Sequence, residues 1–187
     1  MLTGIPVWMV IKGDDLAAGY PNTQQESWLR IVFGNDPMIV NLSKPGNYSG
    51  SMVATFEYEI ALHKPKYALI HCGTTDAVLG VPNEEFAFNV DALVAMANRQ
   101  GTEAIICIPP LVKNINIEER LKGYRDILRS CDDVILCDFY EIIDDDDNLS
   151  ILEFGDELYF DGVYMNAEGH RRLAKIFNEH YAPLFFE

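Results

Sequence analysis

The chain has 187 residues, a hydrophobic fraction of 49% and a formal net charge of −15, which fits one domain with a core of ordinary size. It contains no run of 18 apolar residues, so a membrane-spanning helix is not expected, and its large excess of acidic residues makes nucleic acid an unsuitable partner. The first residues lack a basic segment and a small-residue cleavage site, so we expect no signal peptide and a cytoplasmic location.

Short apolar runs alternate with helix-like segments along the chain. Strands are predicted at residues 5–12, 37–42, 66–72, 103–108 and 133–138. Helices are predicted at residues 26–34, 50–63, 83–100, 117–130 and 167–180, the last with Asn166 as its N-cap. Continuous apolar strands are typical of sheets buried on both faces. The pattern therefore predicts one α/β domain over residues 1–187, with a five-stranded parallel sheet between two layers of helices.

Polar residues follow several of these strands. Asp14 and Asp15 come after the first strand, Gly46 after the second, and the segment 74–76 after the third. In an open parallel sheet, ligands bind outside the carboxyl ends of the strands. We therefore expect these residues to gather on one rim of the sheet.

The acidic residues are unevenly distributed. The segment 130–170 holds 13 of the 29 acidic residues and no Lys or Arg. Its "DDDDN" run, residues 144–148, is interpreted as a solvated loop, with weak binding of divalent cations as the alternative. The whole segment could instead meet a basic surface on a protein partner. The four cysteines have no ligand spacing, so we expect reduced thiols in the core and no zinc site.

Four short blocks in order carry a resemblance to a known family. They are Gly13-Asp14-Asp15-Leu16, the loop glycine Gly46, Gly73-Thr74-Thr75-Asp76 and Asp161-Gly162-Val163-Tyr164. With them the chain resembles the SGNH hydrolases, or GDSL esterase/lipase family, over roughly residues 5–178. The resemblance implies a flavodoxin-like α/β/α sandwich, the SGNH hydrolase fold, with strand order 2-1-3-4-5.

The resemblance also implies which positions would be catalytic, and at three of them this chain has a different residue type. The family's nucleophilic serine corresponds to Asp15, its oxyanion-binding asparagine to Thr75 and its basic histidine to Tyr164, while Gly46 and Asp161 are retained. Losing the nucleophile or the base of such a triad costs on the order of 10⁴–10⁶ in rate. An unperturbed phenol, with a pKa of roughly 10, is a poor base. We therefore expect no serine-type acyl transfer and assign no catalytic residue.

The first functional hypothesis is a non-catalytic pseudo-esterase that binds a small polar or sugar-like ligand, or a protein partner, without a cofactor. The candidate ligand-binding residues are Asp14, Asp15, Tyr20, Gly46, Thr74, Thr75, Asp76 and Tyr164. Carboxylates accept hydroxyl hydrogens and tyrosines offer a ring face, which suits a carbohydrate-like ligand. The Tyr164 hydroxyl is expected to hydrogen-bond to Asp15, directly or through one water. For Asp14 and Asp76, a supporting role in the loops is the plainer interpretation.

The second hypothesis is a hydrolase with replaced chemistry. A divalent cation held by Asp15, Asp76 and Asp161, with Asp14 nearby, could activate water. Alternatively, Asp15 could act as a carboxylate nucleophile, although no base for it is evident. His71 shares the end of a strand with Cys72 but points to the opposite face, which argues against a dyad. His170 is interpreted as a surface or packing residue of the last helix.

Overall fold

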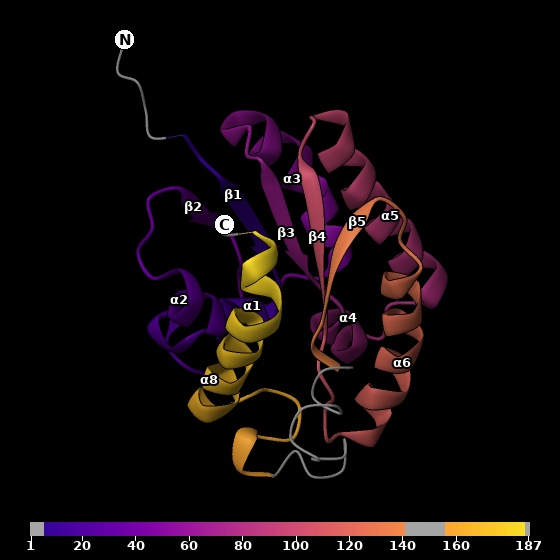
Figure 1. The fold of residues 1–187 in the computed structure, drawn as a ribbon. Coiled ribbons are helices and arrows are strands. Elements are labelled where there is room, and N and C mark those ends of the chain that lie inside the picture. Colours follow the sequence, from indigo (N-terminus) through magenta and orange to yellow (C-terminus); the bar gives the residue numbers. More distant parts are fainter. Residues whose placement is uncertain (1–5, 141–155, 186–187) are drawn as a thin grey trace.

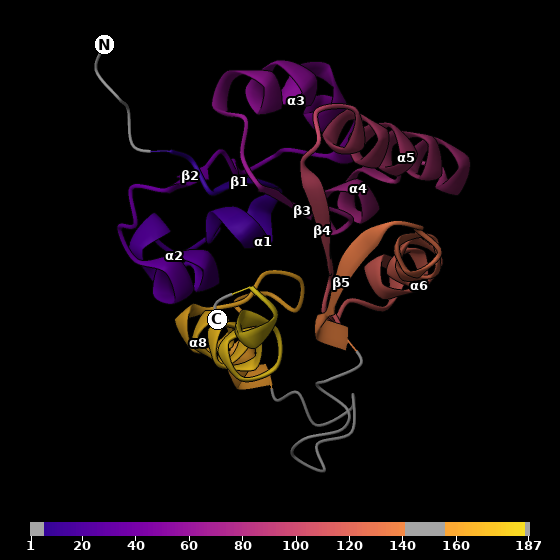
Figure 2. The same cartoon turned by 45° about the horizontal axis from the view of Figure 1, so that its top comes forward.

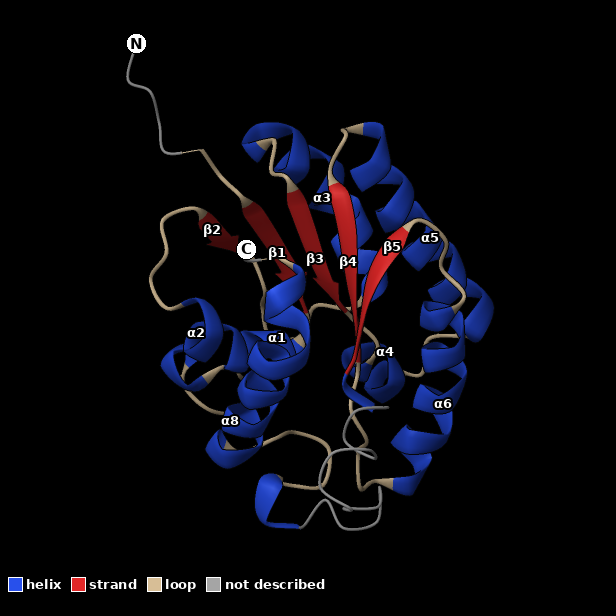
Figure 3. Ribbon diagram, in the orientation of Figure 1, coloured by secondary structure: helices blue, strands red, loops and turns tan. Residues whose placement is uncertain are grey.

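Five parallel strands form the centre of the protein in the computed structural model, which describes residues 6–140 and 156–185 (Figure 1). They are β1 (Met9–Gly13), β2 (Ile39–Asn41), β3 (Tyr67–His71), β4 (Glu103–Ile108) and β5 (Val134–Asp138). Their order is β2-β1-β3-β4-β5, and every neighbouring pair is parallel (Figure 3). The predicted fold class and strand order are therefore confirmed.

Helices cover both faces of this sheet (Figure 2). One face carries α3 (Ser49–His63), α4 (Thr74–Leu79), α5 (Asn83–Arg99) and α6 (Ile115–Arg129). The other carries α1 (Asp15–Ala18), α2 (Trp28–Phe33) and α8 (Ala167–Ile176), with the 3₁₀ turn η1 (Gln24–Glu26) beside them. Shorter turns are η3 (Asp156–Leu158), the π-helical η4 (Phe177–Tyr181) and η5 (Ala182–Leu184).

The sheet separates two apolar cores. Along β1, Met9 and Ile11 pack against the α1–α2–α8 side, whereas Val10 packs against the α3–α5–α6 side. This alternation is the two-residue period of a strand. Because the strand has apolar side chains on both faces, its sequence is a continuous apolar run. Three of the cysteines, Cys72, Cys107 and Cys137, are buried free thiols, as the sequence predicts.

Element boundaries differ modestly from the predicted ranges. The first strand is described over Met9–Gly13 instead of residues 5–12, and the last predicted helix continues beyond Ile176 as a π-helical turn. Asn166 caps α8 as predicted, because its side chain accepts hydrogen bonds from the N–H groups of Glu168 and Gly169. In residues 6–140 and 156–185, no helix is both long enough and apolar enough to cross a membrane. The acidic run 144–148 lies outside these ranges.

Two short helices at the carboxyl edge were not predicted. Helix α1 begins two residues after β1, and α4 begins three residues after β3. They have four and six residues, which is too short to show a helical period in the sequence. Because each starts at the end of a central strand, they bring the segments 14–16 and 74–76 together on one rim.

Candidate functional site

The Asp15 carboxylate is the point at which the rim segments meet. Asp15 is the first residue of α1 and only 5% exposed. Its Oδ1 accepts a hydrogen bond from the Gly46 N–H at 2.9 Å, and its Oδ2 accepts one from the Thr75 hydroxyl. Burial raises the pKa of this carboxyl, and the two hydrogen bonds partly offset that rise. Residues from three strand ends thus converge on one carboxylate.

Gly46 presents its N–H to Asp15 from a backbone conformation that favours glycine. Its φ is +80°, in the left-handed region, within the loop between β2 and α3. No atom lies within 4 Å of where a Cβ would be, so space alone would admit a side chain there. The requirement for glycine is therefore conformational and not steric.

Asp14 lies beneath the site and holds its loops together. It is fully buried and caps α1, where its Oδ1 accepts from the Leu16 N–H at 3.2 Å. Its Oδ2 accepts from the Thr74 N–H at 3.2 Å, and the buried His71 Nδ1 lies 3.0 Å from its Oδ1. These contacts tie the end of β3 to the end of β1. They support the structural interpretation of Asp14 and leave it no exposed surface toward a ligand.

Asp76 makes a separate network on the α3 side of the rim. It is fully buried, and its Oδ1 accepts from the Ser49 N–H at 3.0 Å and from the Ser49 hydroxyl at 2.5 Å. Asn89 donates to the same Ser49 hydroxyl at 3.0 Å. Burial raises the pKa of Asp76 to about 6, although the Ser49 hydrogen bonds lower it. Asp76 therefore anchors the first turn of α3. Ser49 and Asn89 carried no motif that would have predicted this role.

Two tyrosines from distant segments form the open side of the site. The rings of Tyr20 and Tyr164 meet edge to face, with centroids 5.0 Å apart and planes at 86°. Burial and the nearby carboxylates of Asp15 and Asp161 raise the pKa of Tyr164 to about 12, so its phenol stays protonated at neutral pH. The exposed Asp161 accepts hydrogen bonds from the Val163 and Tyr164 N–H groups, each at 3.0 Å, and so closes its own turn.

The predicted direct hydrogen bond between Tyr164 and Asp15 is wrong. No hydrogen bond in the described part of the chain joins the two side chains, and the partners of the Asp15 carboxylate are Gly46 and Thr75. Thr75 can reach the carboxylate because it lies in the first turn of α4, directly after β3, the strand next to β1. The sequence offered a signal that was overlooked: an acceptor-only carboxylate and a hydroxyl donor follow neighbouring strands.

The three carboxylates considered for a cation are not gathered. Asp15 pairs with Gly46 and Thr75, Asp76 with Ser49, and Asp161 with its own turn. Among the residues that the structure describes, no group of three or more His, Cys, Asp or Glu side chains is arranged to hold a metal ion. The site formed by Asp15, Asp76 and Asp161 therefore lacks the geometry that the cation hypothesis needs.

His170 is a core residue and not a surface residue. It is fully buried on α8, and its Nδ1 accepts a hydrogen bond from the Trp28 N–H at 3.3 Å. Burial lowers the pKa of His170 to about 4, and the neighbouring His71 contributes to that shift. The folded protein therefore binds this proton less readily than the unfolded chain, whose histidine has a pKa near 6.5.

This histidine should make the fold sensitive to acid. Because its folded pKa is lowered, its contribution to stability is full above pH 6.5 and is lost as the pH falls towards 4, by at most about 3 kcal/mol. The raised pKa of Asp76 acts in the opposite direction between about pH 4 and 6, so the profile of the unchanged protein mixes both effects. We expect the difference in free energy of unfolding between the protein and H170Q to shrink as the pH falls from 7 to 4. Urea titrations at each pH measure it, and a constant difference would refute the assignment to His170.

Comparison with known proteins identifies a family and a relative that this chain resembles. The sequence profile of the GDSL-like lipase/acylhydrolase family matches residues 12–172. An arylesterase of Vibrio mimicus is 25% identical over 111 residues, and this match spans about half of each protein, 54% of this chain and 56% of the relative.

Solved structures show the same fold at low sequence identity. A member of the lipolytic G-D-S-L family from Veillonella parvula superposes with a TM-score of 0.77 at 17% identity, covering 92% of this chain and 97% of the other. The psychrotrophic esterase EstA from Pseudoalteromonas superposes with a TM-score of 0.74 at 17% identity, covering 97% of this chain and all of the other.

Proposed function

Because the chain belongs to the GDSL-like lipase/acylhydrolase family, we propose that it is a member in which Asp15, Thr75 and Tyr164 replace the catalytic serine, asparagine and histidine. In this proposal the protein does not hydrolyse esters. It uses the rim to bind a small, neutral, hydroxylated ligand of the sugar or polyol type.

The main support for the proposal is that the chain's own Asp15 carboxylate binds the hydrogen-bond donors that an ester substrate would need. In the family's mechanism, the loop glycine N–H and the residue at position 75 would stabilise an oxyanion. Here both the Gly46 N–H and the Thr75 hydroxyl donate to the chain's own Asp15 carboxylate. Removing a single oxyanion donor costs about 10²–10³ in rate. In this chain two donors are already bound to Asp15. The negative charge of that carboxylate would also repel the oxyanion of an acyl-transfer transition state, so the loss of rate should exceed that from removing one donor.

The chemistry of the rim indicates which ligand it would accept. Tyr164 is a protonated phenol, and its ring packs against that of Tyr20, which is 43% exposed. Asp15 and the exposed Asp161 are both acceptors and would repel a carboxylate or a phosphate. Neutral hydroxyl groups can donate to those oxygens, and the C–H face of a sugar can lie on a tyrosine ring. These features support a neutral polyol over an anionic ligand.

The decisive experiment measures ester hydrolysis and ligand binding on the same preparation. We expect p-nitrophenyl acetate hydrolysis at the background rate, with or without Mg²⁺ or Mn²⁺, and no change in D15A. Turnover that D15A abolishes would instead support Asp15 as a nucleophile. Turnover that appears only with the metal would support the cation hypothesis, and either result would refute the proposal.

Binding is tested with xylose, glucose and glycerol by calorimetry. At least one of them should bind, and binding should weaken in Y20A and Y164A because each variant removes a ring face. Tyr58→Ala is the matched control, since Tyr58 is 72% exposed on α3, outside the rim. Equal binding in all four proteins would place the ligand elsewhere. The suggested basic protein partner for segment 130–170 stays a separate proposal.

A further inference from the structure

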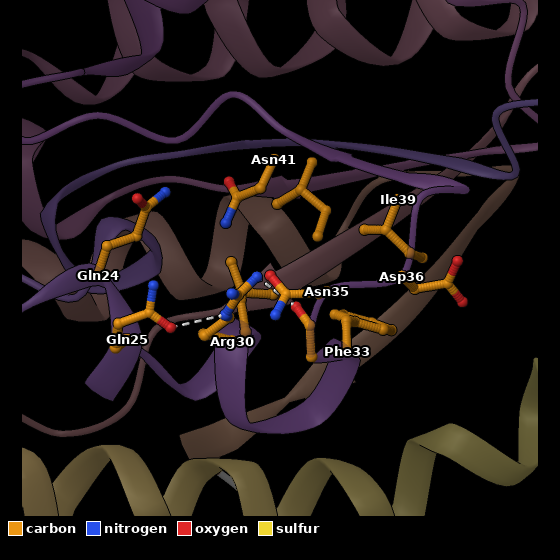
Figure 4. A pocket seen from close by; sticks show the side chains of 11 residues that line it. Gln24, Gln25, Arg30, Phe33, Asn35, Asp36, Ile39 and Asn41 are labelled. Carbon is orange, nitrogen blue, oxygen red and sulfur yellow. Dashed lines mark hydrogen bonds between the residues drawn. The ribbon is translucent and has the colours of Figure 1, made fainter.

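A cavity of about 340 Å³ lies between η1, α2 and the edge strand β2, in the size range of small-molecule sites (Figure 4). It shares no residue with the rim cluster around Asp15. Its lining combines the Arg30 guanidinium and the side-chain amides of Gln25 and Asn41 with apolar side chains. No step of the proposed function uses it.

Arg30 supplies a positive charge that forms no ion pair within the described part of the chain. Its Nε donates to the Gln25 Oε1 at 3.0 Å, and its Nη1 donates to the Gly34 carbonyl at 2.7 Å. Both acceptors are neutral, and within residues 6–140 and 156–185 Arg30 forms no ion pair with an acid, although the chain carries a net charge of −15. Of the five guanidinium N–H groups, two are used, so three remain to bind a ligand.

The side-chain amides around Arg30 are oriented as donors. The Gln25 oxygen accepts from Arg30, and the Asn41 Oδ1 accepts from the Ser43 N–H at 2.9 Å. With both oxygens engaged, each amide has its NH₂ group left to donate. Figure 4 shows Gln25, Arg30 and Asn41 around one space. Asp36 lines the same cavity, but its Oδ1 accepts from the Met38 N–H at 2.8 Å.

Four of the lining residues are apolar. Ile11 and Leu29 are buried in the core, and Phe33 and Ile39 are partly exposed. A guanidinium with neighbouring amide donors matches the two oxygens of a carboxylate, and the apolar lining residues match a short hydrocarbon chain. We infer that this cavity binds a small aliphatic carboxylate, with its charged group on Arg30 and its hydrocarbon part over Leu29 and Phe33.

Three probes of equal size and different charge test this inference: butyrate, butyramide and butylammonium. In ¹H–¹⁵N NMR spectra, butyrate should shift the signals of the Gln25 and Asn41 amides and of the Arg30 Nε–H in a saturable manner. Butyramide and butylammonium should bind at least about tenfold more weakly, which corresponds to about 1.4 kcal/mol. Equal binding of butyramide, or binding of inorganic phosphate without butyrate, would overturn the inference.

Variants separate this site from the Asp15 rim. R30Q should lose at least about tenfold in butyrate affinity, and N41D, which keeps the acceptor for Ser43, should lose a similar amount by charge repulsion. R99Q is the matched control, because Arg99 is exposed and pairs with Glu57 on another surface. D15N should bind butyrate unchanged. Loss of binding in D15N or R99Q, or full binding in R30Q and N41D, would show that butyrate does not bind at Arg30.

Discussion

The triple variant D15S/T75N/Y164H is expected to hydrolyse p-nitrophenyl acetate at least about 10³ times faster than the unchanged protein, whereas D15S alone stays at the background rate. Serine at position 15 would supply a nucleophile and release the Gly46 N–H from the resident carboxylate. Asparagine at position 75 would add an amide donor, and histidine at position 164 would add the base. D15S alone keeps Tyr164, and burial still raises the pKa of its phenol, which therefore stays protonated and cannot take the serine proton at neutral pH.

The fold already holds a residue that could orient the restored histidine. Asp161 uses its Oδ1 to close its own turn, and its Oδ2 makes no hydrogen bond within the described residues. The control is the double variant T75N/Y164H, which retains Asp15 and should remain inactive. Activity is followed as p-nitrophenol release, together with thermal unfolding to verify that each variant is folded. A folded triple variant without turnover would mean that the three positions alone do not account for the missing chemistry.

Removing Glu118 is expected to lower the free energy of unfolding by about 3–5 kcal/mol, because it leaves a buried arginine without its counter-charge. Arg125 is 1% exposed, and its Nη1 donates to the Glu118 Oε1 at 2.6 Å. The same guanidinium donates to the carbonyl oxygens of Pro109 and Pro110 at 2.8 and 2.6 Å. Glu118 also accepts from the Val112 N–H at 3.0 Å. The pair therefore holds the loop that follows β4.

Urea unfolding of E118A against E119A measures this contribution. Glu119 is the next residue on α6 but forms an exposed pair with Lys122, so its removal should leave stability almost unchanged. The double variant E118L/R125M should recover much of the loss, since apolar residues of similar size can replace a buried ion pair. A loss below about 1 kcal/mol in E118A would contradict the view that this pair is a principal support of the β4 loop.

The order of the elements was predictable because it depends on local patterns. Strands β1, β3 and β4 are largely apolar runs buried on both faces, β5 is a partly buried apolar run, and the helices between the strands show a 3.6-residue period. The gathering of Asp15, Gly46 and Thr75 was also predictable, since the carboxyl ends of parallel strands share one edge. Helices α1 and α4 were not, because four and six residues are too few to repeat the 3.6-residue period that would reveal them.

Side-chain partners depended on geometry that the sequence does not carry. Tyr164 was expected to hydrogen-bond to Asp15 directly or through one water; no direct bond joins them in the described residues, the Tyr164 ring packs against Tyr20, and Thr75 binds the carboxylate. The Asp76–Ser49 contact joins residues 27 positions apart, and it depends on how the tertiary fold places the start of α3 next to the first turn of α4. The Arg30 cavity likewise exists only because η1, α2 and β2 enclose it.

By itself, the sequence determined the α/β/α architecture, the family and the residues that stand at the rim, because periodicity and motif order are properties of the chain. Only the tertiary structure decided that Asp15 engages Gly46 and Thr75, that Asp14 and Asp76 are buried supports, and that His170 lies in the core. A hydrogen bond requires two atoms within about 3 Å and in line, and that is fixed by packing between segments distant in the sequence.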